Sequence, residues 1–436
     1  MTRNKTQRLW LKAKKIIPGG NMMLSKKPEL FLPEKWPPYF SKTKGCKVWD
    51  LDGREYTDLS IMGVGTNILG YNNLEVDQAV KKTIKKGNMS TLNCPEEVYL
   101  SEKLIKMNPW AQMAKFTRTG AEANSVAIRI ARAASGKDNI AVCGYHGWHD
   151  WYLAANIKNR SNLNKHLLAG LNVLGVPKKL ENTVFPFSYN KIEELENIVK
   201  TKKIGVIKME VSRNFEPKNN FLKKVREIAN RKKIILIFDE CTSGFRQTFG
   251  GLHKYYKVEP DMAIYGKAMG NGYAINAILG KRKIMKHAES TFISSTFWTE
   301  RIGPTAALKT LEIMKRIKSW KIITSKGKKV IKEWKKLSKK YNLEIVCTGI
   351  PALARFEIKS KNFNKYKALI TQEFLKENML ASNMIYFCVE HSNKVINSYL
   401  EVLDRTFKKI EECENGRKIE DFLKSKVSFN SFERVN

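Results

Sequence analysis

The residues best suited to chemistry follow two apolar runs in the middle of the chain. The run at 234–238 is followed by Asp239, and the run at 262–265 is followed, after one glycine, by Lys267. Ligands of open α/β sheets bind beyond the carboxyl ends of the strands, so an acid and an amine at two such ends are candidate catalytic groups. A plain ion pair between Asp239 and Lys267 is the alternative interpretation.

A glycine-containing turn at 117–123 adds a third candidate group. Its residues Thr119, Gly120 and Ala121 lead directly into a helix pattern at 124–131. The first turn of a helix offers unpaired backbone N–H groups and the positive end of the helix dipole, which together hold phosphates. An ordinary helix cap is the alternative. Together with a strand-end lysine and acid, the turn fits a phosphorylated aldehyde cofactor.

These groups require a sheet that brings several strand ends together. The apolar runs that predict its strands are 139–143, 204–209, 234–238, 262–265 and 275–279. Several of them are apolar at consecutive positions, as is typical of strands covered on both faces, and helical patterns lie between most of them. We therefore expect a large α/β domain with a mainly parallel sheet over residues 71–320.

The segments on either side predict a second, smaller domain. In the N-terminal segment 1–70, a hairpin is expected at 48–53, with its turn at Asp52-Gly53. The C-terminal segment 321–436 contains the apolar runs 343–347 and 353–358, followed by helical patterns at 366–378 and 394–411. This alternation predicts a small α+β domain over 321–436, which the N-terminal segment joins.

Taken in order, these motifs resemble the class III aminotransferases, the pyridoxal 5'-phosphate (PLP) enzymes of fold type I. Among them, the glutamate-1-semialdehyde 2,1-aminomutases are the most similar. The matching segments, which span nearly the whole chain, are 15–20, 119–123, 145–147, 238–240, 244–246 and 266–272. The resemblance implies PLP as the cofactor, a fold type I transferase, and an enzyme.

The resemblance assigns the two catalytic roles. Lys267 would form a Schiff base with the cofactor aldehyde, be displaced by the substrate amine, and then move a proton between the substrate and cofactor carbons. Asp239 would face the pyridine nitrogen and keep it protonated, so that the ring can accept electrons.

The same resemblance implies the remaining cofactor contacts. Gly120 and Ala121 would bind the phosphate through backbone amides, and Thr119 would add a hydroxyl where the family more often has serine. Tyr145 would stack on one face of the ring. Cys241 stands at the position facing the other ring face, where the family usually has a branched aliphatic residue.

A threonine near residue 300 implies a homodimer. The segment 294–297 resembles the family segment in which a threonine, here Thr296, reaches across a dimer interface to the cofactor phosphate of the other subunit. The family usually continues with Ser-Gly-Asn-Pro, whereas this chain continues with 298–301, which ends in Arg301. This departure concerns the substrate rather than the cofactor.

A second departure also affects the substrate side. The aminomutases have an arginine for the substrate carboxylate in a Ser-Pro-Val-Arg context, where this chain has 21–27, with Ser25 and Lys26 but no arginine. Lys26 or Arg301 could bind a carboxylate instead, and a solvated surface cation is the alternative for each. Glu210, which follows the run 204–209, is a further substrate-site candidate.

Two activities are compatible with these features. One is an aminotransferase that moves an amino group from an amino donor to an aldehyde or ketone acceptor through a lysine Schiff base. The other is glutamate-1-semialdehyde 2,1-aminomutase itself, which transfers the group within one molecule to give 5-aminolevulinate. Both use small-molecule substrates, and fold and cofactor do not decide between them.

Composition bears on partners and location. The 436 residues include 79 Lys plus Arg and 42 Asp plus Glu, a net charge of +37, but the lysines are dispersed and no nucleic-acid partner is expected. The seven cysteines lack CxxC spacing, and no metal site is expected. No apolar run could span a membrane, and the N-terminus lacks the apolar core of a signal peptide, so we expect a cytoplasmic protein without membrane contact.

Overall fold

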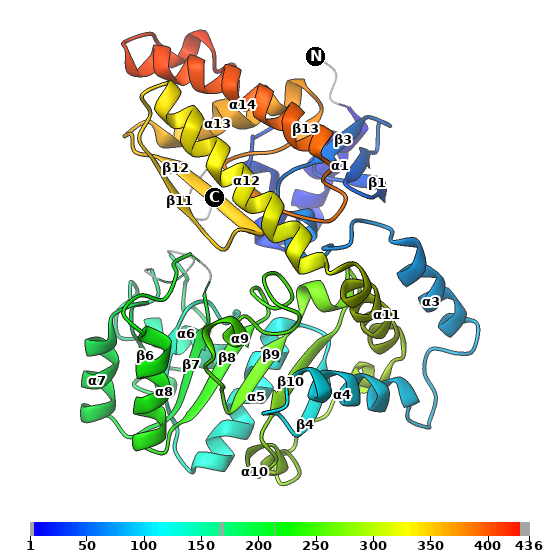
Figure 1. Cartoon of the computed structure of the whole chain (residues 1–436), viewed down its shortest axis with the longest axis vertical. Coiled ribbons are helices and arrows are strands. Elements are labelled where there is room, and N and C mark those ends of the chain that lie inside the picture. The colour runs from blue at the N-terminus through cyan, green and yellow to red at the C-terminus, as the bar shows by residue number, and fades with distance from the viewer. Residues whose placement is uncertain (1–3, 165, 167–169, 213, 428–436) are drawn as a thin grey trace. The chain divides into compact units, whose positions relative to one another are not determined.

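The computed structural model describes residues 4–164, 166, 170–212 and 214–427, and the chain divides into two compact units (Figure 1). One, the central unit, is Leu74–Lys321. The other, the terminal unit, combines the described residues up to Asn73 with those from Ile322 onward. The terminal unit thus draws its structure from both ends of the sequence.

The central unit contains a seven-stranded sheet within its described residues. In spatial order its strands are β4 (Met113–Thr117), β10 (Asn276–Gly280), β9 (Met262–Tyr265), β8 (Ile235–Glu240), β7 (Ile204–Glu210), β5 (Asn139–Cys143) and β6 (Val184–Pro186). Strand β10 is antiparallel to both of its neighbours, and the other pairs are parallel. The predicted mainly parallel sheet is confirmed, and its polar strand ends meet along one edge.

Besides the sheet, the central unit contains helices, several of which border the sheet in Figure 1. They are α3 (Leu74–Ile84), α4 (Pro95–Met107), α5 (Gly120–Ser135), α6 (Asp150–Leu153), α7 (Ile192–Thr201), α8 (Phe221–Arg231), α9 (His253–Tyr256), α10 (Arg282–Met285) and α11 (Ile302–Ile317). Helix α5 packs across β4, β10, β9, β8 and β7. It can do so because small and branched apolar residues recur on one face, among them Ala123, Ala127 and Ile130, all fully buried.

The sequence located most of these strands closely. Strands β5 and β9 have the predicted bounds, and β7, β8 and β10 differ from theirs by one or two residues. Strand β4 was missed because Lys115 and Thr117 interrupt its apolar pattern. It ends at Thr117, immediately before the turn that opens α5, so it positions that turn.

The terminal unit contains two small sheets in its described part. The first has the order β1 (Phe40–Lys44), β2 (Lys47–Asp50), β3 (Glu55–Asp58) and β13 (Met379–Leu380). The second has the order β11 (Ile345–Thr348), β12 (Leu353–Ile358) and β14 (Met384–Tyr386). Strands β2 and β3 form the predicted antiparallel hairpin, and β13 pairs in parallel with β3. The first and last parts of the chain therefore share one sheet.

Long helices complete the terminal unit. They are α1 (Lys5–Ile16), α12 (Ser319–Lys340), α13 (Phe363–Lys376) and α14 (Asn393–Glu414), with the short α2 (Met62–Gly65); the first turn of α12 belongs to the central unit. Helices α13 and α14 pack against each other. Phe374 and Tyr399 stack between them with ring centroids 4.7 Å apart. This contact extends the core of the unit between the two helices.

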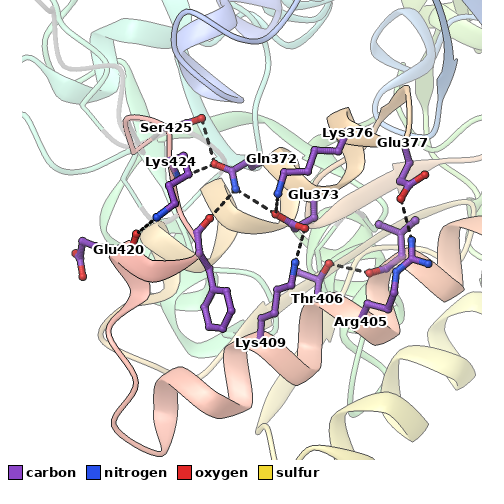
Figure 2. Close-up of polar contacts among 12 residues, drawn as sticks. Gln372, Glu373, Lys376, Glu377, Arg405, Thr406, Lys409, Glu420, Lys424 and Ser425 are labelled. Carbon is purple, nitrogen blue, oxygen red and sulfur yellow. Dashed lines mark hydrogen bonds and ion pairs between the residues drawn. The ribbon is translucent and has the colours of Figure 1, made fainter.

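A polar network on α13 fixes the segment that follows α14, as Figure 2 shows. The Gln372 side chain donates to the Phe422 carbonyl at 2.9 Å and accepts from the Lys424 backbone N–H at 2.8 Å. The adjacent Glu373 accepts from Lys376 and Lys409, each at 2.6 Å. Because Gln372 is buried, its loss would leave two backbone groups without their partners.

We therefore expect Gln372→Ala to lower the free energy of unfolding by about 1 to 3 kcal/mol, the cost of unpaired buried polar groups. The matched control is Glu377→Ala, which removes an exposed ion pair with Arg405 and is expected to cost less than about 1 kcal/mol. Urea titration of the two variants measures the difference. Equal losses would show that the Gln372 contacts do not hold this segment.

Candidate active site

The turn between β4 and α5 forms the N-terminal cap of α5. The Thr119 hydroxyl accepts from the Glu122 backbone N–H at 3.3 Å, and the Glu122 carboxylate accepts from the Thr119 N–H at 2.8 Å. This capping box fixes the first turn of α5, which begins with Gly120 and Ala121. The arrangement forms a helix N-terminus at the sheet edge where β8 ends.

Asp239 lies near the end of β8 and is only 4% exposed. Its Oδ2 lies 2.9 Å from His146 Nδ1 and 3.8 Å from Lys208 Nζ, and its Oδ1 accepts from the Cys241 N–H at 3.1 Å. Burial by itself raises the pKa of Asp239, but the Lys208 ammonium and the His146 hydrogen bond outweigh burial and hold that pKa below its ordinary value. Asp239 is therefore a buried, ionised carboxylate.

His146 belongs to the loop that follows β5 and is also buried. Burial lowers the pKa of His146, although Asp239 acts to raise it. A neutral imidazole donates to Asp239 from Nδ1, so Nε2 is left as an acceptor. Among the described residues, Nε2 has no hydrogen-bond partner. His146 thus orients the carboxylate without adding a full charge.

Lys267 opens the 3-10 turn η5 (Lys267–Gly270) directly after β9. Its φ of 43° is in the left-handed region, which is unusual for a residue other than glycine. Its Nζ donates to the Thr242 hydroxyl at 2.7 Å. A strained backbone at a strand end with an oriented amine is typical of a functional position.

Cys241 and Asn276 join the three groups into one site. Cys241 Sγ lies 3.5 Å from Asn276 Oδ1, and Asn276 Nδ2 donates to the Arg118 carbonyl at 3.0 Å. A Cβ placed on Gly120 would lie 3.5 Å from Cys241 Sγ, and one on Gly266 only 1.9 Å from Asn276 Oδ1. The start of α5, the end of β8 and the turn before Lys267 therefore meet here, and Gly266 permits the close approach.

The loop after β5 adds Tyr145 and Glu210 to the neighbourhood. The Tyr145 N–H donates to Glu210 Oε2 at 3.1 Å, and Gly147 lies against Ala121 so closely that a Cβ there would be 2.9 Å from the Ala121 Cβ. Tyr145 is partly buried against the core, with its ring 6.0 Å from that of Tyr152. The loop is thus packed onto the start of α5.

The remaining predicted residues are not joined to this group by the described contacts. Thr296 is exposed on the 3-10 turn η7 (Thr296–Thr299), and Ser25 and Lys26 lie on the 3-10 turn η1 (Leu24–Lys26) of the terminal unit. Arg301 binds Glu96 through Nε at 3.1 Å and Nη2 at 2.7 Å. A substrate role for Arg301 would require that ion pair to open, and the roles of these four residues stay predictions.

Four participants were not assigned these roles from the sequence. His146 was visible in the 145–147 motif, but its pairing with Asp239, 93 positions further along the chain, depends on the fold. Lys208 lay inside the apolar run 204–209, where a lone lysine was a usable signal. Thr242 and Asn276 carried none, because their importance comes from contacts between distant strands.

The group of side chains fits PLP. A buried, ionised carboxylate suits a protonated ring nitrogen, a lysine amine at a strand end suits an aldehyde, and a helix N-terminus suits a phosphate. Gly266 lets the backbone before Lys267 pack directly against Asn276, and Gly120 lies within contact distance of Cys241, so the three elements meet closely at this point. Within the described part of the chain, no cluster of three or more His, Cys, Asp or Glu suits a metal ion, and no helix could cross a membrane.

Comparison with known proteins gives the class. The family model of the class III aminotransferases matches residues 34–388. The chain therefore belongs to the class III aminotransferases, which depend on PLP. It is an enzyme of this family, as the sequence motifs predicted.

Individual relatives span nearly the full length. The 3-aminobutyryl-CoA aminotransferase of Cloacimonas acidaminovorans is 33% identical over 93% of this chain and 97% of its own. The glutamate-1-semialdehyde 2,1-aminomutase of Hyperthermus butylicus is 26% identical over 92% and 98%. Both types of enzyme considered from the sequence are thus represented.

Solved structures share the fold. The FumI protein of Sphingopyxis sp. MTA144, in its PLP internal aldimine form, superposes with a TM-score of 0.85 at 23% identity, covering 96% of this chain and 99% of its own. A transaminase with PLP bound gives a TM-score of 0.83 at 20% identity, covering 95% and 100%. The predicted α/β fold of the type I PLP-dependent transferases is confirmed.

The low pKa of Asp239 has a measurable consequence for stability. Because that pKa lies below the unfolded value of about 3.9, the ionised carboxylate stabilises the folded protein above this pH, and the contribution is lost as pH falls toward the folded pKa. We expect the loss of unfolding free energy caused by Asp239→Asn to shrink by at least about 1 kcal/mol between about pH 6 and pH 3. Urea titrations of the cofactor-free protein at both pH values measure it.

The control is Asp138→Asn, which changes an exposed aspartate in the turn before β5. It should alter stability little at either pH. A cost of Asp239→Asn that does not change with pH would contradict the ionised, stabilised carboxylate.

Proposed function

We propose that this enzyme transfers an amino group between two separate molecules, an amino donor and an aldehyde or ketone acceptor. The observation that carries the proposal is the full-length similarity to a 3-aminobutyryl-CoA aminotransferase, at 33% identity. The aminomutases that align over comparable lengths are 26 to 28% identical. We infer a CoA thioester with an amino or oxo group on its acyl chain as one substrate.

The charges beside the start of α5 support this substrate class. Arg301 is held by Glu96, and Arg118 forms an ion pair with Glu300 at 2.8 Å. Both guanidinium groups are thus neutralised within the central unit. A substrate with a free carboxylate at this end would have to open an ion pair, whereas a thioester would not.

Lys267 and Asp239 would carry the chemistry. When bound, PLP supplies an aldehyde that takes up the amino group and a ring that accepts electrons. Lys267 would attach the cofactor and then move a proton at the substrate carbon from its Nζ, with Thr242 orienting that amine. Asp239 would hold the proton of the ring nitrogen, and His146 would keep the carboxylate in place.

The other cofactor contacts follow from the same placement. Gly120 and Ala121 would bind the phosphate through the start of α5, and Thr119 would support them as the helix cap. Cys241 and Tyr145 would contact the ring. Among the described residues, Cys241 already lies beside the Gly120 backbone, which supports its place in the site.

We further propose that the enzyme is a cytoplasmic homodimer, with the exposed Thr296 of each copy completing the phosphate site of the other. The central unit would act as the large cofactor-binding domain and the terminal unit as the small domain. Ser25, Lys26 and Glu210 are each proposed as residues that bind the substrate. Sedimentation equilibrium tests the dimer, and cell fractionation tests the location.

The second candidate is the intramolecular glutamate-1-semialdehyde 2,1-aminomutase. One aminomutase is also 33% identical to this chain, but the match covers only 72% of this chain. The absence of an arginine from 21–27 speaks against glutamate 1-semialdehyde as the substrate. The two activities differ in their products, so a direct assay separates them.

The PLP-loaded enzyme is incubated with 3-aminobutyryl-CoA and no acceptor. We expect about one equivalent of the 3-oxo thioester per active site, because the amino group remains on the enzyme. Mass spectrometry of the released thioester measures it. Glutamate 1-semialdehyde, in the parallel assay, should give no catalytic formation of 5-aminolevulinate.

The control variants are Lys267→Ala and Lys223→Ala, the second on the exposed face of α8. Lys267→Ala should reduce turnover at least about a thousandfold through loss of the proton-transferring amine, and Lys223→Ala should have no effect. Catalytic 5-aminolevulinate formation would establish the second candidate instead. Full activity of Lys267→Ala would overturn both.

A further inference from the structure

A lysine lies in the interior of the central sheet, behind the cofactor-facing carboxylate. Lys208 is the fifth residue of β7, and its side chain is fully buried. By strand register it pairs with Val142 of β5 and Ile237 of β8, so it lies on the same sheet face as these apolar residues. That face packs against α5.

Lys208 is directed at Asp239. Its Nζ is 3.8 Å from Asp239 Oδ2 and has no hydrogen-bond partner among the described residues. Asp239 already receives hydrogen bonds from His146 and from the Cys241 backbone. The ammonium therefore interacts with the carboxylate through its positive charge, without a hydrogen bond of its own.

Protein stability alone does not account for this lysine. A buried ammonium without hydrogen bonds loses its hydration, and an ion pair at this distance repays that cost poorly. Val206, two residues earlier on the same face, and the register partners Val142 and Ile237 are apolar and fully buried. An apolar side chain would satisfy the core at position 208, so packing does not require a charge there. The carboxylate within ion-pair distance of this charge is Asp239.

We propose that Lys208 is a positioning residue for Asp239 that sets how strongly this carboxylate pairs with the ring nitrogen of PLP. The buried ammonium holds Asp239 ionised and in place before the cofactor binds. Once the cofactor is bound, it competes with the protonated ring nitrogen for the same carboxylate. The inference rests on the proposed role of Asp239 in the function above.

The surrounding charges agree with this assignment. Burial lowers the pKa of Lys208, whereas Asp239, Cys241 and Glu210 act to raise it. Glu210 is on the same strand and face, and the loop after β5 presents His146. Lys267 also interacts electrostatically with Cys241. Asp239 is the ionised group that lies within ion-pair distance of Lys208.

The proposal predicts an energetic coupling between Lys208 and one atom of the cofactor. A positive charge that shares a carboxylate with a second positive charge weakens the binding of the second, and the effect is reciprocal. Removing Lys208 should strengthen binding of a cofactor with a protonated ring nitrogen. It should not strengthen binding of an analogue that has carbon in place of that nitrogen.

The experiment compares PLP with deazapyridoxal phosphate, in which carbon replaces the ring nitrogen. The full chain is freed of cofactor, and both dissociation constants are measured for the wild type and for Lys208→Met. We expect the preference for PLP over the analogue to rise about tenfold or more in the variant, as removal of one nearby buried charge implies. The thermal midpoint of the cofactor-free variant should fall, and PLP should recover more of that loss than the analogue does.

Matched variants separate this effect from ordinary packing. Val206→Ala, on the same strand and face, should lower stability and leave the preference unchanged. In an Asp239→Asn background, Lys208→Met should also leave the preference unchanged, because the shared carboxylate is gone. Lys208→Gln removes the charge with a polar side chain and serves if the methionine variant does not fold.

An unchanged preference in Lys208→Met or Lys208→Gln would overturn the proposal and assign Lys208 to packing. This outcome is distinct from failure of the proposed function. In that case the wild-type protein itself would fail to bind PLP through Lys267 or to transfer an amino group.

Discussion

The structure of the central unit depends on keeping one carboxylate ionised inside the protein. Removing the Asp239 carboxylate from water costs several kcal/mol, roughly, unless hydrogen bonds and charge replace the water. Three elements supply the replacements: the loop after β5 gives His146, β7 gives Lys208, and the backbone after β8 gives the Cys241 N–H. The order β8, β7, β5 is what brings these groups to one point. The strand order of the sheet therefore determines which groups can stabilise the ionised Asp239.

A second constraint is close backbone approach at the same edge. Gly266 has no room for a side chain beside Asn276, and the next residue, Lys267, takes up a left-handed conformation. Strand β10, which carries Asn276, is antiparallel to its neighbours, so the start of this strand lies at the edge where β8 and β9 end. Asn276 can then contact both Cys241 and the Arg118 carbonyl. The reversed strand thus connects the turn that opens α5 with the turn that begins at Lys267.

How far the sequence could predict this site depends on the range of the contacts. Asp239 and Lys267 were placed at strand ends by local patterns, because an apolar run followed by a polar residue is visible without knowledge of the fold. The direction of β10 and the pairing of His146 with Asp239 were not predictable, since both depend on which distant strands become neighbours. Lys208 was an intermediate case: its charge stood out in an apolar run, but only the register of β7 with β8 shows what it faces. Strand β4 was missed because its polar positions resemble a loop.

The residues that fit the cofactor also differ from those of the segment 298–301 in the contacts that hold them. The groups that fit PLP are held by contacts within the central unit, and they are compatible with both candidate reactions. The segment 298–301 instead uses its charges internally: Glu300 pairs with Arg118, and Arg301 pairs with Glu96. Under the proposed function, a site whose nearby guanidinium groups are already neutralised would favour substrates that do not present a carboxylate there. Substrate choice in this enzyme would then follow from which ion pairs are closed, rather than from the catalytic groups.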